Sequence, residues 1–522
     1  MPRILIIDAL AAGAGRRRSS VDAIGAGPRT VAGVLEQRGK DYELTRVEEV
    51  LRNPRRFTSF DVILVSAMSM DYPSVLRVSR LFRRSLKVLG GPITTDPRVV
   101  SRLGFDLGVY GEGEVALDSL IEMGLFEGAL DPEAAAEIPN VVVGGRPPRE
   151  VRRISRREFW RFRPSVEALR SYRNPSFRAS RVFVEVVRGC SNFRRALVLA
   201  DWSVCSKCGL CLAPLRRAEG CPQGIPPGCG YCSIPAVYGP PKSRRAADLV
   251  EEVRGIIGLG VRRIILSGAD VLEYGRDFVS SPVLDPEHPG PNVSAIKRLL
   301  SSIGSIPEVR EGSVYVGIEN AKPSLMTEEV VEVLAERLPG TAIHVGVETG
   351  HEFHSRLLGR PCGPKRALEA ISAAVRAGLR VYAYFIHGLP GQTVETAAST
   401  VALIERLYEL GVEKVTVYRF RPLPGSAFEG MREGPPARRD RASSMIERAA
   451  REFNMARKRQ MVDRVLEAVY SGSSYRGLPV LYPLGEGPVM VSAERLRMKP
   501  GESIKVKVLR AVSDRMLLVR PT

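Results

Sequence analysis

The chain has 522 residues and a formal net charge of +19, and hydrophobic residues make up 44% of it. This length suffices for about three domains, each with a hydrophobic core of its own. No run of about eighteen apolar residues occurs, so the sequence predicts no transmembrane span. The chain begins MPRILIIDAL, which is typical of a strand and not of a secretory leader, so the eight cysteines are expected in a reducing, cytoplasmic location.

The positive charge has two interpretations. An excess of Lys and Arg favours a polyanionic partner such as nucleic acid. Much of the charge is Arg, however, and surface ion pairs rich in Arg are also found in proteins of heat-loving organisms. Charge alone therefore leaves both interpretations open.

Apolar runs and helical segments alternate over residues 1–145. The runs are those of parallel strands covered on both faces, at 4–10, 62–68, 86–92 and 106–114, with helices expected at 29–39 and 73–84. This order predicts a doubly wound, Rossmann-like α/β domain. Small residues follow its strands, where backbone can approach a flat ligand: Ser66, Gly90, Gly91, Gly111 and Gly113.

Residues 146–180 form a predicted basic linker, in which arginines alternate with aromatic residues such as Phe159, Trp160 and Tyr172. Arg beside an aromatic ring can stack on nucleic acid bases. Such a segment can equally pack its rings against the neighbouring domains and leave its charges in water. The sequence leaves both roles open.

Seven of the eight cysteines lie between Cys190 and Cys232. Four of them follow the ferredoxin spacing C-x2-C-x2-C…C-P, in which short gaps let thiolates wrap a [4Fe-4S] cluster: Cys205, Cys208, Cys211 and Cys221. The other three, Cys190, Cys229 and Cys232, would bind three irons of a second cluster and leave one iron open to a substrate or cofactor. Two alternatives stay open: zinc bound by paired C-x2-C units, and a trio made of Cys221 with Cys229 and Cys232.

A second β/α alternation extends over residues 181–430, with the cysteine-bearing segment 191–228 inserted after its first strand. The predicted strands lie at 182–189, 262–269, 313–320, 341–350, 380–390 and 414–420, separated by amphipathic helices. Alternation of this kind predicts a parallel sheet, and about six units fit a partial (β/α)6 barrel better than a complete eightfold one. Functional residues are expected at the carboxyl ends of the strands.

Two segments of this region carry a family resemblance. Arg188-Gly189-Cys190 and Cys229-Gly230-Tyr231-Cys232 resemble the two ends of the radical S-adenosylmethionine (SAM) motif, C-x3-C-x2-C. The departure is that residues 191–228 replace the usual three between the first two cysteines, as if a ferredoxin-like loop had been inserted there. The resemblance implies a cluster on Cys190, Cys229 and Cys232 whose open iron is chelated by SAM.

Further segments match that superfamily at the ends of later strands. Gly268-Ala269-Asp270 stands where the superfamily has a Gly-Gly-Glu motif, Glu348 matches an acidic SAM contact, and Gly388-Leu389-Pro390 resembles the segment that holds the adenine. With Tyr231, the resemblance implies that these residues contact SAM. His387 is more typical of a packed histidine than of a base, and Cys362 is expected to be a lone thiol.

The order of strands and glycines in residues 1–145 resembles the cobalamin-binding domain that precedes many radical SAM enzymes. The resemblance implies cobalamin contacts at the five small residues named above. No histidine occurs before His288, so the D-x-H-x-x-G ligand motif of other cobalamin proteins is absent. The alternative is a flavodoxin-like accessory domain without a cofactor.

The chain changes character after residue 430. A basic helix is expected over 441–470 within the segment 431–470, and short strands follow at 478–483, 488–496, 503–512 and 515–521. Short strands divided by Gly and Pro predict a small β-barrel. Residues 471–522 resemble a TRAM domain, which implies affinity for RNA. A barrel that only closes the mouth of the catalytic domain is the alternative.

These resemblances imply a radical SAM enzyme with two [4Fe-4S] clusters, SAM and cobalamin. Electrons from a donor such as ferredoxin or flavodoxin would drive cleavage of SAM, and the activity expected first is methyl transfer to an unactivated carbon, with RNA as the leading substrate. Three alternatives stay open: an RNA methylthiotransferase, a cobalamin-independent radical SAM isomerase or cyclase, and a redox-sensing RNA-binding iron-sulfur protein.

Overall fold

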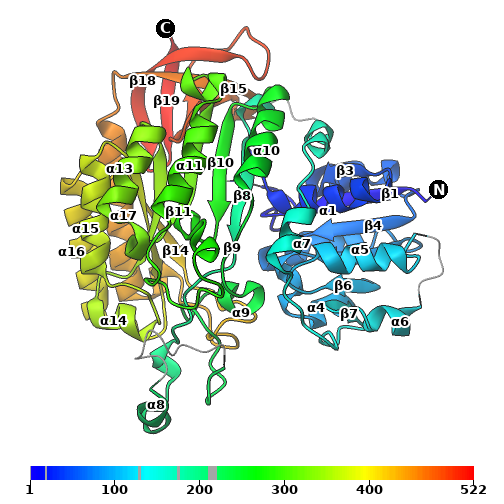
Figure 1. Ribbon diagram of the computed structural model, residues 1–522. Coiled ribbons are helices and arrows are strands. Elements are labelled where there is room, and N and C mark those ends of the chain that lie inside the picture. Colours follow the sequence, from blue (N-terminus) through cyan, green and yellow to red (C-terminus); the bar gives the residue numbers. More distant parts are fainter. Residues whose placement is uncertain (1, 18–19, 127–130, 173–176, 210–219) are drawn as a thin grey trace. The chain divides into compact units, whose positions relative to one another are not determined.

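The structure is a computed structural model, and it describes residues 2–17, 20–126, 131–172, 177–209 and 220–522 (Figure 1). The chain divides into two compact units, Met1–Asn174 and Pro175–Thr522, which are described separately. Within the ranges just given, no helix has the length and apolarity needed to cross a bilayer.

The first unit is the predicted Rossmann-like domain. Its sheet has the order β3-β1-β4-β5-β6-β7, parallel except for β7, which is antiparallel to β6. The strands are β1 (Ile4–Asp8), β3 (Glu43–Arg46), β4 (Val62–Ser66), β5 (Leu86–Gly90), β6 (Leu107–Val109) and β7 (Val141–Val143). The helices are α1 (Ala26–Gln37), α2 (Val47–Arg52), α3 (Tyr72–Ser79), α4 (Arg98–Arg102), α5 (Glu114–Glu122), α6 (Pro132–Ala136) and, in the linker, α7 (Arg156–Arg161).

The central strands β1 and β4 are buried along their whole length, as their unbroken apolar sequences predict. Leu5 and Ile7 of β1 belong to one hydrophobic core with Val75 and Val78 of α3. Because the sheet is parallel, its strands carry their small terminal residues to one edge.

The second unit contains the predicted partial barrel. Its parallel strands follow the order β14-β13-β12-β11-β10-β8, and β9 (Lys242–Ser243) pairs antiparallel with the end of β8. The parallel strands are β8 (Arg181–Arg188), β10 (Arg263–Gly268), β11 (Tyr315–Ala321), β12 (Ala342–Glu348), β13 (Arg380–His387) and β14 (Lys414–Arg419).

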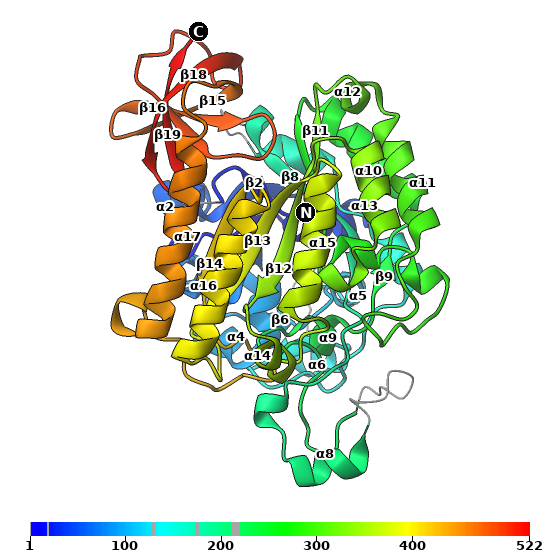
Figure 2. The same cartoon turned by 90° about the vertical axis from the view of Figure 1, so that its left-hand side faces the viewer.

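Helices cover one face of this sheet, as both views show (Figure 1, Figure 2). They are α10 (Ala246–Gly258), α11 (Val293–Gly304), α13 (Glu328–Arg337), α15 (Pro364–Arg376), α16 (Val394–Glu409) and α17 (Arg441–Arg459). The unit also contains four shorter helices outside this layer, α8 (Trp202–Cys208), α9 (Ile234–Tyr238), α12 (Pro307–Arg310) and α14 (Glu352–Leu357). Strand residues alternate accordingly: Val381, Ala383 and Phe385 of β13 are buried apolar residues, whereas Tyr382 and Tyr384 point to the opposite side. We call that side the open face of the sheet.

The chain ends in a closed barrel with the strand order β15-β16-β17-β19-β18, which fits the expected TRAM-like domain. Its strands are β15 (Val465–Tyr475), β16 (Leu478–Pro483), β17 (Val489–Ser492), β18 (Ser503–Ser513) and β19 (Met516–Pro521). The expected helix over 441–470 was wrong in its second half, because α17 stops at Arg459 and β15 begins at Val465. Asp463, with a φ of 67°, turns the chain between them.

This barrel lies at the amino-terminal end of the parallel strands. Arg380, the first residue of β13, donates a hydrogen bond to the carbonyl oxygen of Glu486 at 2.8 Å, and Arg262, just before β10, donates to Ser503. In both views α8, α9 and α14 lie at the other end (Figure 1, Figure 2). The barrel therefore closes the end opposite to the carboxyl ends of the strands, and it is not a lid on that mouth.

Candidate active site

Cys190 comes directly after β8, at the carboxyl edge of the sheet. Gly189 before it has a φ of 88°, and a Cβ there would lie 2.3 Å from the carbonyl oxygen of Pro240, so only glycine fits. The backbone N–H of Cys190 donates to the carbonyl oxygen of Gly239 at 3.0 Å. This turn fixes the first cysteine beside the segment that carries Cys229.

The thiols of Cys190, Cys229 and Cys232 are free, and they lie close enough together that Cys229 raises the pKa of both Cys190 and Cys232. Burial raises the pKa of Cys190 to about 11, although Lys322 opposes the shift, and burial with the neighbouring Cys229 raises that of Cys232 to about 12. Asn192 donates from its side chain to the sulfur of Cys229 at 3.3 Å. Thiols gathered in this way, one buried and two partly buried, are stable as thiolates when a metal supplies positive charge, so these residues fit an iron-sulfur cluster.

A buried charge network lies against Cys190. The ammonium nitrogen of Lys322, just after β11, is 3.6 Å from the sulfur of Cys190, 2.5 Å from Glu273 and 3.7 Å from Asp270. Burial would raise the pKa of Glu273, but Lys322 and Arg276 outweigh it and lower that pKa to about 2. Burial raises the pKa of Asp270 to about 6 in spite of Lys322. The network thus holds a cation and a carboxylate beside the first cysteine.

A second cation lies against Cys229. Arg360 is 4.0 Å from the sulfur of Cys229, donates to the hydroxyl of Tyr231 at 3.0 Å, and lies 3.6 Å from a carboxylate oxygen of Glu348. Glu348 ends β12 with a φ of 70°, beside a shift of register with β13. A non-glycine residue with such a φ is strained, and strain of this kind is concentrated at functional sites. Burial raises the pKa of Glu348.

The residues predicted to contact SAM lie along the same carboxyl edge. Asp270, Tyr231 and Glu348 join the two networks around the cysteines, and Gly268 packs so tightly that a Cβ would lie 2.6 Å from a backbone oxygen of Val187. The segment at the end of β13 is also at this edge, with Gly388 in a positive φ of 73°. Its Leu389 is buried in a small apolar cluster with Phe420 and Phe428, against which Tyr231 packs. Ala269 lies between Gly268 and Asp270, and Pro390 accepts a hydrogen bond at its carbonyl from His354 at 2.9 Å.

Five polar residues around the thiols were not predicted from the sequence: Asn192, Lys322 and Arg360, which contact a sulfur, and Glu273 and Arg276, which pair with each other beside Lys322. The sequence did contain one indication of Lys322, because this residue directly follows an apolar strand. In a parallel sheet, polar residues at the carboxyl ends of the strands face the functional site. Arg360 carried no such signal, since it lies in a loop between two helices. Cys362 is a free thiol, as expected, and burial raises its pKa.

The expected auxiliary cluster is only partly within the described residues. Cys205 and Cys208 lie three residues apart on α8 and so on one side of that helix, and the side chain of Gln223 donates to the sulfur of Cys205 at 3.0 Å. Cys221 is a free, partly buried thiol. Cys211 lies outside the described residues, so this ligand set stays a prediction.

In the first unit, the five predicted cobalamin contacts lie at or just beyond the carboxyl ends of β4, β5 and β6. Ser66 is buried, and Gly91 has a φ of 90° that lets it lie against Ala67. Gly90, Gly111 and Gly113 are partly exposed. Beside them two methionines stay unusually exposed, Met68 at 38% and Met70 at 50%. Glycines next to exposed apolar side chains fit a large, flat ligand with apolar edges.

The linker packs on the first unit, as one of its two interpretations predicted. Phe159 and Phe162 are buried, and Arg161 caps the ring of Phe162 with its guanidinium 4.8 Å from the ring centre. Tyr172 is buried and donates to Asp8 at 3.1 Å. These rings serve the core, so they are not available to stack on bases.

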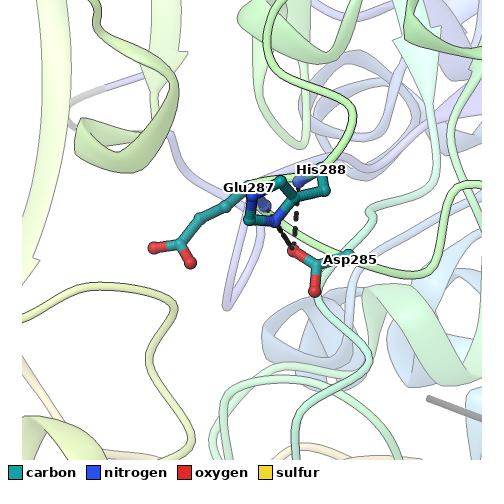
Figure 3. Close-up of side chains that lie close together, drawn as sticks. All are labelled: Asp285, Glu287 and His288. Atoms are coloured by element: carbon teal, nitrogen blue, oxygen red, sulfur yellow. Dashed lines mark hydrogen bonds and ion pairs between the residues drawn. The ribbon is translucent and has the colours of Figure 1, made fainter. Parts of the chain in front are cut away.

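Asp285, Glu287 and His288 form the group of possible metal ligands that stands out in the described residues. Asp285 already accepts backbone hydrogen bonds from Glu287 and His288, as in an ordinary loop turn. Figure 3 shows the Glu287 carboxylate directed away from the other two, and it pairs with Arg194 at 3.0 Å. These hydrogen bonds and the ion pair show that the three residues stabilise a loop.

Comparison with known proteins identifies the family to which the chain is similar. Residues 216–404 match the radical SAM superfamily. The uncharacterized protein MK0932 of Methanopyrus kandleri is 40% identical over 98% of this chain and 95% of its own length. The ribosomal protein uS12 methylthiotransferase RimO of Symbiobacterium thermophilum is 26% identical over 63% of this chain and 64% of its own.

A solved structure with a similar fold is TsrM from Kitasatospora setae, described as a radical S-adenosylmethionine methyltransferase. With tryptophan and a SAM analogue bound, it gives a TM-score of 0.56 at 15% identity and covers 86% of this chain and 83% of TsrM. With cobalamin and a [4Fe-4S] cluster bound, it gives a TM-score of 0.54 at 14% identity, over 82% of this chain and 73% of TsrM. At such identities the likeness establishes the fold.

Proposed function

The chain belongs to the radical SAM superfamily of enzymes, in one family with the Methanopyrus kandleri protein, and from that premise we propose that it is a cobalamin-dependent methyltransferase acting on an unactivated carbon. The observation that carries the proposal is the trio of Cys190, which is buried, with the partly buried Cys229 and Cys232, and a cation beside two of its sulfurs. When bound there, a reduced [4Fe-4S] cluster supplies the electron that cleaves SAM to methionine and a 5′-deoxyadenosyl radical.

The charged residues beside the trio have separate tasks in this proposal. Asp270 and Lys322 present a carboxylate and an ammonium 3.7 Å apart, which are complementary to the ammonium and carboxylate of the methionine part of SAM. Glu348, held by Arg360, accepts hydrogen bonds from hydroxyl or amino groups further along the ligand. Leu389 and its apolar neighbours keep water from the adenine side.

We assign cobalamin to the carboxyl edge of the first unit's sheet. Support comes from the glycines and the exposed Met68 and Met70 at that edge, and from the fold likeness to TsrM, one structure of which holds cobalamin. That edge offers no histidine, because His288 is the first in the chain. The corrin would therefore be held by its edges and faces, with no imidazole on cobalt. A flavodoxin-like domain without a cofactor is the competing assignment.

We propose structured RNA as the substrate and a ferredoxin or flavodoxin of the cytoplasm as the electron donor. The support for RNA lies in the C-terminal barrel, whose exposed cations outnumber its exposed acids: Arg464, Arg476, Arg495, Arg497, Lys499, Lys505, Arg510, Arg515 and Arg520. Basic residues gathered on a small barrel are typical of backbone contacts to nucleic acid. In contrast, α17 uses part of its charge internally, since Arg457 lies 4.2 Å over the ring of Tyr408.

A methylthiotransferase is the second candidate, favoured by the similarity to RimO. That family is expected to hold an auxiliary cluster on N-terminal cysteines, whereas no cysteine precedes Cys190 here. The test is anaerobic reconstitution followed by dithionite and SAM. Release of 5′-deoxyadenosine together with a bound corrinoid in the visible spectrum supports the methyltransferase. Release without corrinoid favours a methylthiotransferase, isomerase or cyclase, and no release at all favours a redox-sensing protein.

A further inference from the structure

The open face of the second unit's sheet carries a group of aromatic and polar side chains that the proposed SAM site does not use. It comprises Glu319 on β11, His344 on β12, Tyr382 and Tyr384 on β13, and Lys414, Thr416 and Tyr418 on β14. The register His344↔Tyr382↔Lys414 and the alternation along each strand put these side chains on the side away from the helices. All of them belong to one unit.

Two of the rings form a rigid platform. Tyr384 and Tyr418 are stacked with ring centres 5.9 Å apart and planes 9° from parallel. The hydroxyl of Tyr384 is hydrogen-bonded to His344 at 3.2 Å, and His344 is itself stacked on Tyr382 at 5.3 Å. Tyr418 ends this series on the edge strand β14 and is 55% exposed. Because Tyr384 stacks on one side of the Tyr418 ring, the exposed part of that ring offers a flat surface on which a planar ligand can stack.

Acceptors without a partner lie beside the platform. Glu319 is within electrostatic reach of Tyr418 and takes no hydrogen bond from any described residue. The hydroxyl of Thr416 and one carboxylate oxygen of Glu486 are buried and also have no hydrogen-bond partner in the described part of the chain. Buried polar atoms are normally paired, so the Thr416 hydroxyl and the Glu486 oxygen indicate a missing hydrogen-bond partner.

The C-terminal barrel contributes two turns to this region. Glu486 lies in the turn between β16 and β17, which packs on Tyr315 and is held by the 2.8 Å hydrogen bond from Arg380 to its carbonyl oxygen. Arg515, in the turn between β18 and β19, interacts electrostatically with Tyr418 and Lys414, although its side chain is 84% exposed. Arg515 therefore joins the basic surface of the barrel to the edge of the open face.

We propose that this face is a nucleobase site for guanine. Tyr418 stacks on the base, and Glu319 accepts hydrogen bonds from its N1–H and from the adjacent exocyclic amino group. A carboxylate matches that edge because its two oxygens accept two parallel hydrogen bonds, as they do from an arginine. Arg515 would contact the attached phosphate. The inference rests on the proposed function, because it names the part of an RNA substrate that enters the half-barrel, as enzymes acting on bases require.

Equilibrium binding of guanosine 5′-monophosphate to the reconstituted full-length protein tests the inference, with adenosine 5′-monophosphate and ribose 5-phosphate as comparison probes. We expect guanosine monophosphate to bind at least about tenfold more tightly than either, since a bidentate pair discriminates against ligands that cannot form it. Tyr418→Ala and Glu319→Gln should each lose about tenfold. The exposed Tyr475→Ala and Glu311→Gln are matched controls that should bind as the unmodified protein does.

Circular dichroism and thermal unfolding of each variant establish that it is folded before binding is compared. Equal binding of ribose 5-phosphate, or unchanged binding by the folded Tyr418 and Glu319 variants, would overturn the inference. The proposed function is tested separately by 5′-deoxyadenosine release from the unmodified protein. Release without selective nucleotide binding contradicts only the nucleobase site, and selective binding without release contradicts only the proposed enzyme activity.

Discussion

The ammonium nitrogen of Lys322 lies 3.6 Å from the sulfur of Cys190, although the two residues are 132 positions apart in the chain. The parallel sheet explains this proximity, because Cys190 follows β8 and Lys322 follows β11, and both strands end at the same edge. Lys322 is also the shared partner of Glu273 and Asp270. One buried cation thus balances a thiol and two carboxylates.

Lys322→Met should therefore destabilise the protein and alter the cluster. Removing one partner of a buried ion pair leaves uncompensated charge and costs about 3–5 kcal/mol, so we expect a lower unfolding temperature. In reconstituted protein, loss of the cation should make the cluster harder to reduce, which potentiometric electron paramagnetic resonance measures. Lys297→Met, on the exposed side of α11, is the matched control. If the two variants have the same midpoint potential, Lys322 does not act on the cluster.

Glu319 gives a prediction for pH. Burial, opposed by Arg181 and aided by Glu486, raises its pKa to about 7. When folding raises the pKa of a carboxyl, the folded protein becomes less stable as the pH rises from the unfolded-state pKa to the folded-state pKa. For Glu319 this loss of stability falls between about pH 4.5 and 7. Glu319→Gln removes that loss, on the order of 2 kcal/mol. The unfolding temperature of the variant relative to the unmodified protein should rise from pH 5 to pH 8, and a constant difference would show that Glu319 has an ordinary pKa.

Cobalamin in the first unit should bind without an imidazole on cobalt. The reason is that no histidine precedes His288 and none lies among the residues at the edge of that sheet. Electron paramagnetic resonance of the Co(II) form should show no nitrogen splitting from a protein ligand. A spectrum with such splitting would contradict this assignment, and failure to retain any corrinoid would favour a domain without a cofactor.

RNA binding should depend on the C-terminal barrel. A chain ending near Gly430 is a poor test, because it would remove α17, whose Ile446 and Phe453 are buried. We propose instead to change Arg495, Arg497 and Lys499 to Ser, with Arg80, Arg83 and Arg84 to Ser as the control. Binding of bulk tRNA should fall linearly in log salt, and the barrel variant should reduce the slope by about one for each phosphate that the protein no longer neutralises. Equal slopes for the two variants, or no slope, would remove RNA from the proposal.

Much of the fold could be predicted from the sequence, because the parallel sheets of both units leave clear patterns of apolar residues in it. The unbroken runs of β1 and β4 predicted their burial, and the alternation of strands and helices predicted the partial barrel. The first barrel strand β15 was missed because its residues continue a charged helical segment without a break in composition. Only the turn at Asp463 separates them, and a single residue with positive φ leaves little signal.

The candidate site was predicted only where residues share a short motif. Spacing alone groups the cysteines, but Lys322 and Arg360 reach them through the fold, so no local pattern identifies them. The positions of Glu319 and Tyr418 on one face depend on the register of separate strands for the same reason. The place of the barrel at the amino-terminal end of the sheet was likewise beyond the sequence, since it depends on long-range hydrogen bonds such as that of Arg380 with Glu486.

The central claim is that Cys190, Cys229 and Cys232 hold the cluster at which SAM is cleaved. The most direct measurement compares iron content and 5′-deoxyadenosine release between the unmodified protein and a variant with both Cys229→Ala and Cys232→Ala, after anaerobic reconstitution and reduction. With two [4Fe-4S] clusters, the unmodified protein should hold about eight irons and release 5′-deoxyadenosine. The variant should keep about four irons, on the auxiliary cysteines, and release none. Release of 5′-deoxyadenosine by the variant would contradict the account.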